Sequence, residues 1–214
     1  MSCEFSRLNP SPRYRQLIEI YSGMHQAKPK IFSGGRLRGH LPAIRELVQT
    51  TGAESLLDYG SGKGSLYDQR GLSLKGVGTI PSVKEFLGVR EIRPYDPCVP
   101  QFAAFPAGLQ FDGVISTDVL EHIPSADLPW VVEEMFWLSR KFVFAVVASF
   151  PARKQLPSGE NAHESQKPYW WWRRTVREVA RRHRDVAYHF RIEQDLHIKP
   201  LPRRRIVRVI SGTS

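Results

Sequence analysis

The sequence predicts an α/β protein built on a mostly parallel sheet, and three observations support this. Residues 55–59 form a short apolar run that contains an acid, and glycines follow at alternate positions from Gly60. Residues 142–150 are apolar throughout, as in a central parallel strand that is buried on both faces. Segments with helical spacing alternate with strand-like runs along the rest of the chain. We therefore expect a doubly wound sheet with helices on both faces.

Composition bounds the class of protein. The chain has 214 residues, of which 41% are hydrophobic, and this fits a single domain with a substantial core. Its two cysteines, Cys3 and Cys98, are too few for a disulfide framework and do not suggest a zinc site. No secretory signal is apparent, and the longest apolar run is too short to span a membrane. We expect a cytoplasmic protein that holds no metal and is not bound to a membrane.

The net charge of +10 is concentrated toward the C-terminus, where arginines cluster between Arg173 and Arg208. One interpretation is a solvated helix face. The other is a surface that attracts a phosphorylated partner, such as a nucleotide, a sugar nucleotide or a nucleic acid.

The glycine-rich stretch after residues 55–59 is the strongest local signal. Glycine allows the tight turn and a close approach of the backbone to a ligand, and we expect free N–H groups there, followed by a helix from about Ser65. The spacing is G-x-G-x-G, whereas a dinucleotide fingerprint is G-x-G-x-x-G. With its preceding acid, the stretch resembles the first motif of the class I S-adenosylmethionine-dependent methyltransferases. The resemblance implies that the cofactor, S-adenosyl-L-methionine, is bound by Asp58, Gly60, Ser61, Gly62 and Gly64. Lys63 departs from the commonest family pattern.

Two further motifs support the resemblance. Asp96 and Pro97 follow a predicted strand at 89–95, where a carboxylate can accept hydrogen bonds from ribose hydroxyls; the alternative is a simple Asp-Pro turn. Residues 118–123 read Asp-Val-Leu-Glu-His-Ile and are similar to a stretch of small-molecule methyltransferases. This similarity implies that Asp118 and Val119 lie near the methionine part of the cofactor.

Candidate residues for chemistry and for substrate binding come from two loops and from the N-terminal arm. His122 is a candidate general base, and His163 is the better one, because it lies in a polar loop at 151–169 that resembles a loop of some bacterial methyltransferases. For each histidine the alternative is a packing or solvated role. Asn161 and Glu160 are expected to orient the substrate or the base, and Trp170 to line the pocket. Tyr21 belongs to an arm at residues 1–40 that we expect to cover the cofactor as a lid, together with Tyr14, His25 and Phe32. For each of these four residues the alternative is packing against the outside of the sheet.

The remaining expectations concern the elements of the methyltransferase domain at residues 41–214. Seven strands are expected, and the last two, at 185–192 and 205–210, form an antiparallel hairpin. Residues 101–110 are either a degenerate edge strand or a loop. Helices are expected at 13–21, 41–49, 82–87, 125–138 with a cap at Ser125, and 170–184, and the helix after the glycine loop should be cut short by Gly71.

The function expected from these features is transfer of a methyl group to an oxygen or nitrogen of a small-molecule, glycan or nucleotide acceptor. No Asn/Asp-Pro-Pro-Tyr motif follows the strand at 113–116, which disfavours amino-group methylation of DNA bases. Two alternatives remain open. One is a non-catalytic nucleic-acid-binding protein with this fold, and the other is a nicotinamide-dependent oxidoreductase, which the missing third fingerprint glycine disfavours.

Overall fold

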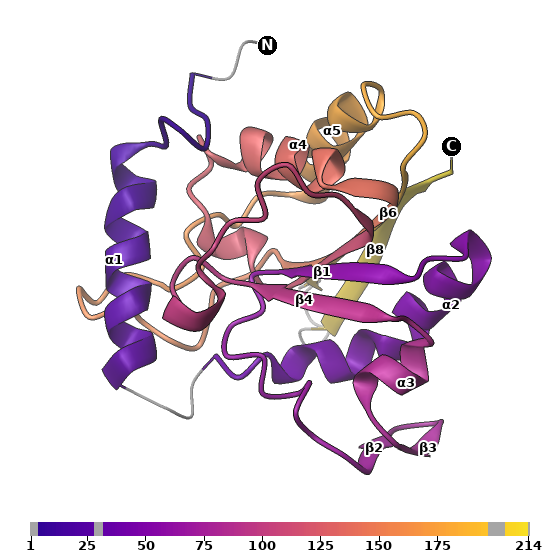
Figure 1. The fold of residues 1–214 in the computed structure, drawn as a ribbon. Helices are drawn as coiled ribbons and strands as arrows, with labels where there is room; N and C mark the ends of the chain where they lie inside the picture. The colour runs from indigo at the N-terminus through magenta and orange to yellow at the C-terminus, as the bar shows by residue number, and fades with distance from the viewer. Residues whose placement is uncertain (1–3, 28–31, 197–203, 214) are drawn as a thin grey trace.

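The computed structural model describes residues 4–27, 32–196 and 204–213, and their main feature is a mixed sheet of six strands (Figure 1). The order across the sheet is β4-β1-β5-β6-β7-β8, and every neighbouring pair is parallel except β7 and β8. The strands are β1 Ser55–Tyr59, β4 Glu91–Tyr95, β5 Phe111–Thr117, β6 Ser139–Ala148, β7 Ala187–Leu196 and β8 Arg204–Gly212. The predicted α/β class and the C-terminal antiparallel hairpin are confirmed.

The chain reverses its direction of winding between β1 and β5. From β1 it passes to β4 on one side, then crosses back to β5 on the other side of β1. Leu57 of β1 is paired with Arg93 of β4 and with Val114 of β5. In open α/β sheets, ligands bind outside the carboxyl ends of the strands at such a reversal.

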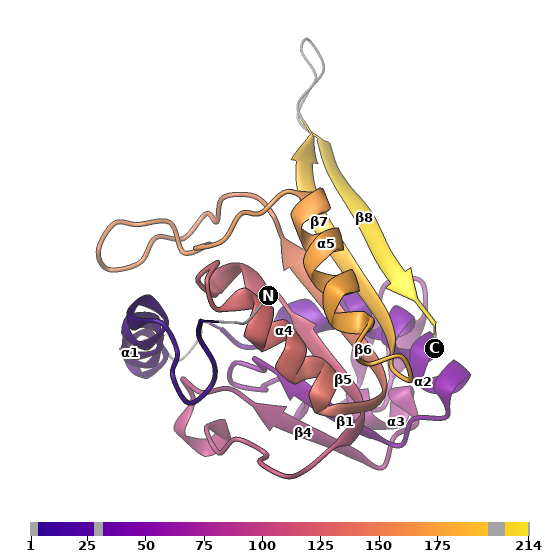
Figure 2. The same ribbon diagram turned by 90° about the horizontal axis from the view of Figure 1, so that it is seen from above.

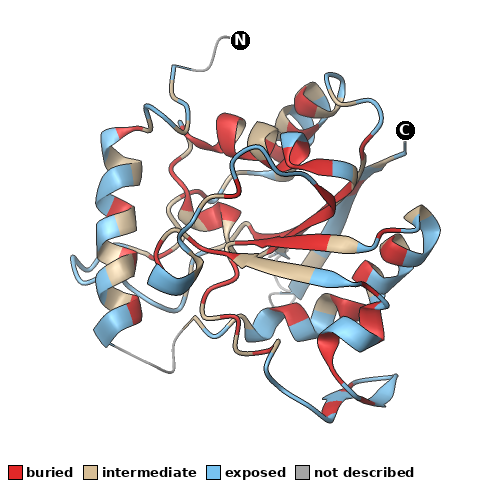
Figure 3. Cartoon of the chain, in the orientation of Figure 1, coloured by how far each residue is buried: buried red, intermediate tan, exposed pale blue. Residues whose placement is uncertain are grey.

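Helices cover both faces of the sheet, as expected (Figure 2). Helices α2 (Leu41–Thr51) and α3 (Val83–Leu87) pack on one face, in a cluster that includes Leu56 and Phe144. Helices α4 (Leu128–Trp137) and α5 (Tyr169–Ala180) pack on the other, in a cluster that includes Leu57 and Phe190. Figure 3 shows the buried residues along β1 and on the helix faces turned toward the sheet.

Two predictions about this region are wrong. Among the described residues, the main sheet has six strands rather than seven, because residues 101–110 form no strand. Pro100 opens a short 3-10 helix there, η2 (Pro100–Phe102), and Pro106 lacks the N–H that a strand ladder needs. No helix follows the glycine loop either. The chain instead makes turns and a small antiparallel hairpin of β2 (Leu72–Leu74) and β3 (Gly78–Ile80).

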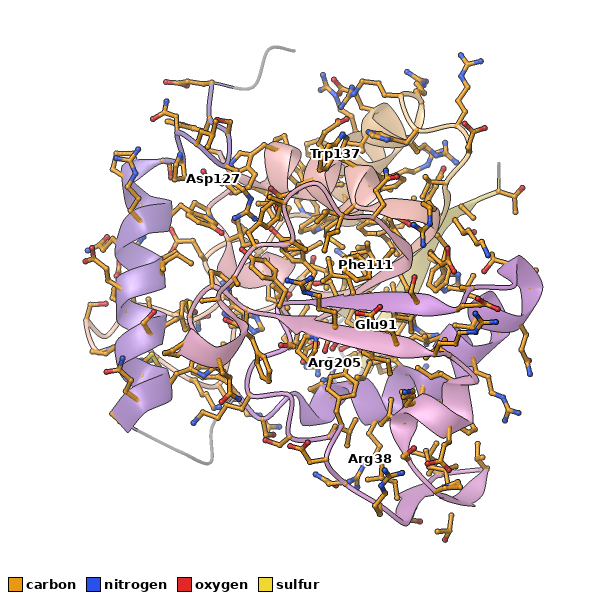
Figure 4. All side chains as sticks on the ribbon, viewed as in Figure 1. Arg38, Glu91, Phe111, Asp127, Trp137 and Arg205 are labelled. Atoms are coloured by element: carbon orange, nitrogen blue, oxygen red, sulfur yellow. The ribbon has the colours of Figure 1, made fainter. Side chains whose placement is uncertain are left out.

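The N-terminal segment is tied to the body of the domain. Helix α1 (Pro12–Ala27) stands across the carboxyl ends of β1 and β4 (Figure 1). Arg7 pairs with the Glu134 carboxylate and lies 3.7 Å from the ring centre of Phe105. Ser11 donates from its backbone N–H (3.0 Å) and its hydroxyl (2.5 Å) to Asp127, which lies beside the chain that enters α1 (Figure 4).

This use of Asp127 also explains why the predicted cap of α4 is wrong. Neither Ser125 nor Asp127 caps the helix with its side chain. The Ser125 hydroxyl contacts that of Ser165 at 3.0 Å, and Asp127 accepts hydrogen bonds from Ser11 and from Trp130 Nε1. Within residues 4–27, 32–196 and 204–213, no helix is both long and apolar enough to cross a bilayer.

Candidate functional site

A cavity of about 860 Å³ lies at the carboxyl edge of the sheet. Its wall is built from α1, from residues 32–36, from the loops that follow β1, β4, β5 and β6, and from Asp195 of β7 and Arg205 of β8. It is large enough for a nucleoside-sized ligand. Nine of the residues predicted for the site line it, and these are Tyr21, Gly60, Gly62, Asp96, Pro97, Asp118, Val119, His122 and His163. Three of the predicted lid residues, Tyr14, His25 and Phe32, line it as well.

The glycines after β1 allow close packing of three segments. Gly60 and Gly62 have φ values of 83° and 56°, which only glycine adopts readily. A Cβ at Gly60 would overlap the Val119 side chain, and one at Gly62 would overlap the carbonyl oxygen of Phe32. The loop is therefore held between the N-terminal segment and the loop after β5.

The amides of the glycine loop are occupied within the protein, so the expectation of free N–H groups is wrong. Gly60 N–H donates to Tyr95 O (2.7 Å), and Gly62 N–H donates to the Asp96 carboxylate (2.8 Å). Lys63 N–H donates to Phe32 O (2.9 Å). What the loop offers a ligand is a wall without Cβ atoms, not a cradle of donors.

Asp96 is placed at the end of β4 by this network. Its two carboxylate oxygens accept hydrogen bonds from Gly62 N–H and from Cys98 N–H (2.9 Å), and the side chain lines the cavity. Burial raises the pKa of Asp96, although these two amides favour the ionised form. Each carboxylate oxygen still has a lone pair, so the group can accept further hydrogen bonds from a ligand.

Asp58, the acid that precedes the glycine loop, does not line the cavity. Its carboxylate is buried and accepts a hydrogen bond from Tyr67 Oη at 2.7 Å. Burial raises its pKa to about 7, and the Tyr67 hydrogen bond opposes the shift. Tyr67 was not predicted for the site, because it follows the loop by only three residues and reads as part of the expected helix.

Asp118 has an unusual backbone conformation, a feature it shares with Phe32 in the cavity wall. Its φ of 57° is uncommon outside glycine, and such strain is found at functional sites. One carboxylate oxygen accepts from Arg36 Nε at 2.6 Å, while buried Oδ1 has no partner among the described residues. Arg36 also pairs with Glu193 at 3.1 Å. Arg36 was not predicted, because it lies in a segment that reads as a loop.

The two histidine candidates are brought together, with ring centres 5.1 Å apart. His122 Nδ1 lies 2.8 Å from Tyr21 Oη and 2.7 Å from Ala162 O, and His163 Nδ1 lies 2.5 Å from Phe150 O. Burial lowers the pKa of His122 to about 4 and lowers that of His163 as well. Both rings are therefore neutral and weakly basic near pH 7.

Glu121 lies beside these rings and is fully buried, at 0% exposure. Its Oε1 accepts from Ala148 N–H at 3.2 Å, and Oε2 has no partner among the described residues. Burial raises its pKa well above the ordinary value, and the negative charge of Asp118 adds to the shift. The sequence indicated Glu121 as an acid near the pocket but assigned it no role. The signal available for Glu121 was its position in the sequence between Asp118 and His122, which both line the cavity.

Besides Asp58, five predicted residues lie outside the cavity wall. Asn161 braces the loop after β6, accepting from Ala152 N–H and His163 N–H at 2.9 Å each. Glu160 is exposed and pairs with Arg13, and Trp170 is 65% exposed. Ser61 and Gly64 belong to the glycine loop but are absent from the wall.

Comparisons with protein-family models, with curated proteins and with solved structures found no match to this chain. The candidate function therefore depends on the geometry of the cavity and on its chemistry.

Proposed function

We propose that the protein is an S-adenosylmethionine-dependent methyltransferase of the Rossmann-like class I type. The observation that carries this proposal is the cavity at the point where the sheet reverses its winding, with Asp96 at its edge. The glycine loop follows the central strand β1, and Asp96 follows the neighbouring strand β4. A carboxylate in that place is suited to accept hydrogen bonds from ribose hydroxyls.

The charge of the site supports a sulfonium cofactor. Asp96 and Asp118 line the cavity, so two carboxylates face the space where a positively charged sulfonium would lie, and Arg36 offsets part of the charge of Asp118. Oriented negative groups stabilise a cation best where water is excluded.

The alternative, a nicotinamide dinucleotide, fits less well. A pyrophosphate is bound by free backbone N–H groups at a helix N-terminus. In this protein the loop amides of Gly60, Gly62 and Lys63 already donate within the chain, and no helix begins after the loop.

The proposed reaction is an in-line attack by an acceptor oxygen or nitrogen on the methyl group of the sulfonium. The methyl group moves to the acceptor, the C–S bond electrons return to sulfur, and a proton leaves the acceptor. Positioning of the two reactants supplies most of the rate. The acceptor is a small molecule, a glycan or a nucleotide, and His163 and His122 lie where its proton would be lost. The exposed arginines of α5, which include Arg173 and Arg177, leave a phosphorylated acceptor or a nucleic acid open as the partner.

Calorimetric titration with S-adenosylhomocysteine, in parallel with NAD and NADP, tests the proposal. We expect binding of S-adenosylhomocysteine alone, with a Kd in the micromolar range typical of metabolite sites. Binding of NAD or NADP instead, or of none of the three, would contradict it.

A pair of aspartate variants makes the test specific. Asp96→Asn should weaken S-adenosylhomocysteine at least tenfold, because a ribose hydroxyl would lose a charged acceptor, which is worth about 1.5–3 kcal/mol. Asp112→Asn is the matched control, since Asp112 is also buried and also accepts a backbone N–H, from Glu54 at 2.7 Å, but lies at the amino end of β5. Equal losses in both variants would point to a general effect on the fold.

A further inference from the structure

Three side chains at the cavity bring together the kinds of atom that bind metal ions. Glu121 and His122 belong to the short 3-10 helix η3 (Leu120–His122), which follows β5. His163 comes from the long loop between β6 and α5. One ligand atom from each of the three lies within 4.8 Å of the others.

The hydrogen bonds of the two rings determine which nitrogen is available. A ring nitrogen that lies 2.7 Å from a carbonyl oxygen must carry a proton, because two lone pairs would otherwise face each other. His122 Nδ1 therefore donates to Ala162 O, and His163 Nδ1 donates to Phe150 O. In both rings Nε2 has the free lone pair. A second-shell carbonyl that orients a histidine in this way is typical of metal sites.

Glu121 gives a second, independent indication. Its side chain is fully buried, and Oε2 has no hydrogen-bond partner among the described residues. An unpaired buried carboxylate is costly. Arg36, which lines the same cavity, pairs with Asp118 and Glu193 rather than with Glu121. A cation bound at Oε2 would satisfy the orphaned atom.

We propose that Glu121 Oε2, His122 Nε2 and His163 Nε2 bind a divalent first-row transition ion. Two ligands with bonds of about 2.1 Å lie at most about 4.2 Å apart across such an ion. One ligand atom from each of the three residues already lies within 4.8 Å of the others, so only a small approach is needed. Two imidazoles and one carboxylate suit Mn²⁺, Fe²⁺, Co²⁺ or Zn²⁺, whereas Mg²⁺ and Ca²⁺ prefer oxygen ligands.

The ion would face the cavity, because both histidines line it. Three protein ligands leave coordination positions open, and a hydroxyl or water bound there becomes more acidic. The inference goes beyond the proposed methyl transfer and does not rest on it. A bound ion would occupy the Nε2 lone pairs that His122 and His163 would otherwise use as general bases, so with the ion bound neither ring would take the acceptor's proton. No spacing motif joins Glu121 and His122 to the distant His163, which is why the sequence did not predict a metal.

Titration of the metal-free full chain with Co²⁺ tests the site. The protein, without a histidine tag, is stripped with a chelator and desalted, and the visible absorption of bound Co²⁺ is followed. We expect one equivalent to bind, with a rise in Tm on binding, because an ion that binds only the folded state stabilises it. Glu121→Gln and His163→Ala should each weaken Co²⁺ at least tenfold.

The matched controls are Glu133→Gln and His183→Ala. These residues also form a carboxylate–histidine pair, at 2.6 Å, but lack a second histidine. They should bind Co²⁺ like the wild type. The proposal is overturned if the wild type binds no Co²⁺, Mn²⁺ or Zn²⁺ up to about 1 mM, the weak end of protein metal affinities. It is equally overturned if Glu121→Gln and His163→Ala, folded by their thermal transitions, bind as the wild type does. S-adenosylhomocysteine binding measured in excess chelator reports on the methyltransferase proposal separately.

Discussion

Buried aspartates of the site differ in what surrounds them. Asp96 accepts two backbone N–H groups at the edge of the cavity, whereas Asp58 accepts a single phenol hydrogen bond in the interior. Burial dominates at Asp58 and raises its pKa to about 7. The folded state therefore holds a proton on Asp58 at pH values where the unfolded chain has released it.

This difference predicts a pH dependence of stability. Because the native state binds the extra proton, the contribution of Asp58 to the free energy of unfolding falls as the pH rises from about 4 to about 7. Three pKa units correspond to a fall on the order of 4 kcal/mol. Urea unfolding of wild type and Asp58→Asn across this range measures it. The difference between the two profiles should slope in this window, and parallel profiles would show that Asp58 ionises normally.

Gly60 is required by contact as well as by conformation. Gly60→Ala should destabilise the fold by about 1–3 kcal/mol more than Gly71→Ala, since overpacking has costs of this size. Both glycines have positive φ, but a Cβ at Gly71 meets nothing within 4 Å. Denaturant unfolding of the two variants gives the comparison. Adding Val119→Ala to Gly60→Ala should recover part of the loss, and failure to do so would place the strain elsewhere.

At the scale of elements, α1 is a fixed wall of the cavity. Its inner side chains, among them Leu17 and Tyr21, line the cavity, and the segment before it is held by Arg7 and Ser11. The predicted lid at residues 1–40 includes residues 1–3 and 28–31, which lie outside the described residues. Tyr21 joins α1 to the histidine pair, because its hydroxyl lies 2.8 Å from His122 Nδ1. The same hydroxyl donates to Ala162 O at 2.8 Å.

The ion pair of Arg7 with Glu134, which anchors the segment before α1, can be tested by substitution. Arg7→Met leaves the Glu134 carboxylate, whose side chain is only 11% exposed, without its cation. We expect a loss of roughly 3 kcal/mol, as for other buried pairs that lose one partner. Thermal or denaturant unfolding measures the loss. Arg7→Met with Glu134→Gln should be less destabilised than Arg7→Met alone, and additive losses would argue that the two side chains act independently.

At the scale of the whole molecule, the cavity is confined to one edge of the sheet. The cavity lies at the edge formed by the carboxyl ends of the parallel strands, whereas the β2–β3 hairpin does not line it. Under the proposed function, S-adenosylhomocysteine should slow amide hydrogen exchange in α1 and in residues 149–168. Exchange in β2 and β3 should be unchanged. Protection centred on α5 instead would place the ligand on the basic C-terminal half, because no residue of α5 lines the cavity.

The elements of the sheet were predictable from sequence because their signals are local. An apolar run bounded by turn residues gave β1 and β6, and helical spacing gave α1 and α2. The helix after the glycine loop was not formed, since Gly71 and Gly76 favour turns and Tyr67 turns inward to Asp58. The cavity wall was predicted in large part, because carboxyl ends of parallel strands meet at one edge.

Contacts between residues far apart in the sequence could not be predicted. No local pattern links Arg36 to Asp118, or Glu121 to His163, and the pairing of loop amides with Phe32 depends on the fold of the N-terminal segment. Asn161 and Trp170 were placed in the correct loop and helix, but the direction of each side chain is decided by packing that the sequence does not display.

The attachment of the N-terminal segment has a consequence for how the chain folds. Arg7 finds its partner 127 residues downstream and Ser11 finds its partner 116 residues downstream. Contacts at such separation form late, because a long loop must close before they give any stabilisation. The segment before α1, which is synthesised earlier than α4, is therefore among the last parts of this fold to dock. Until α4 has been synthesised, the wall formed by α1 has nothing to hold it, and the cavity is completed only near the end of folding.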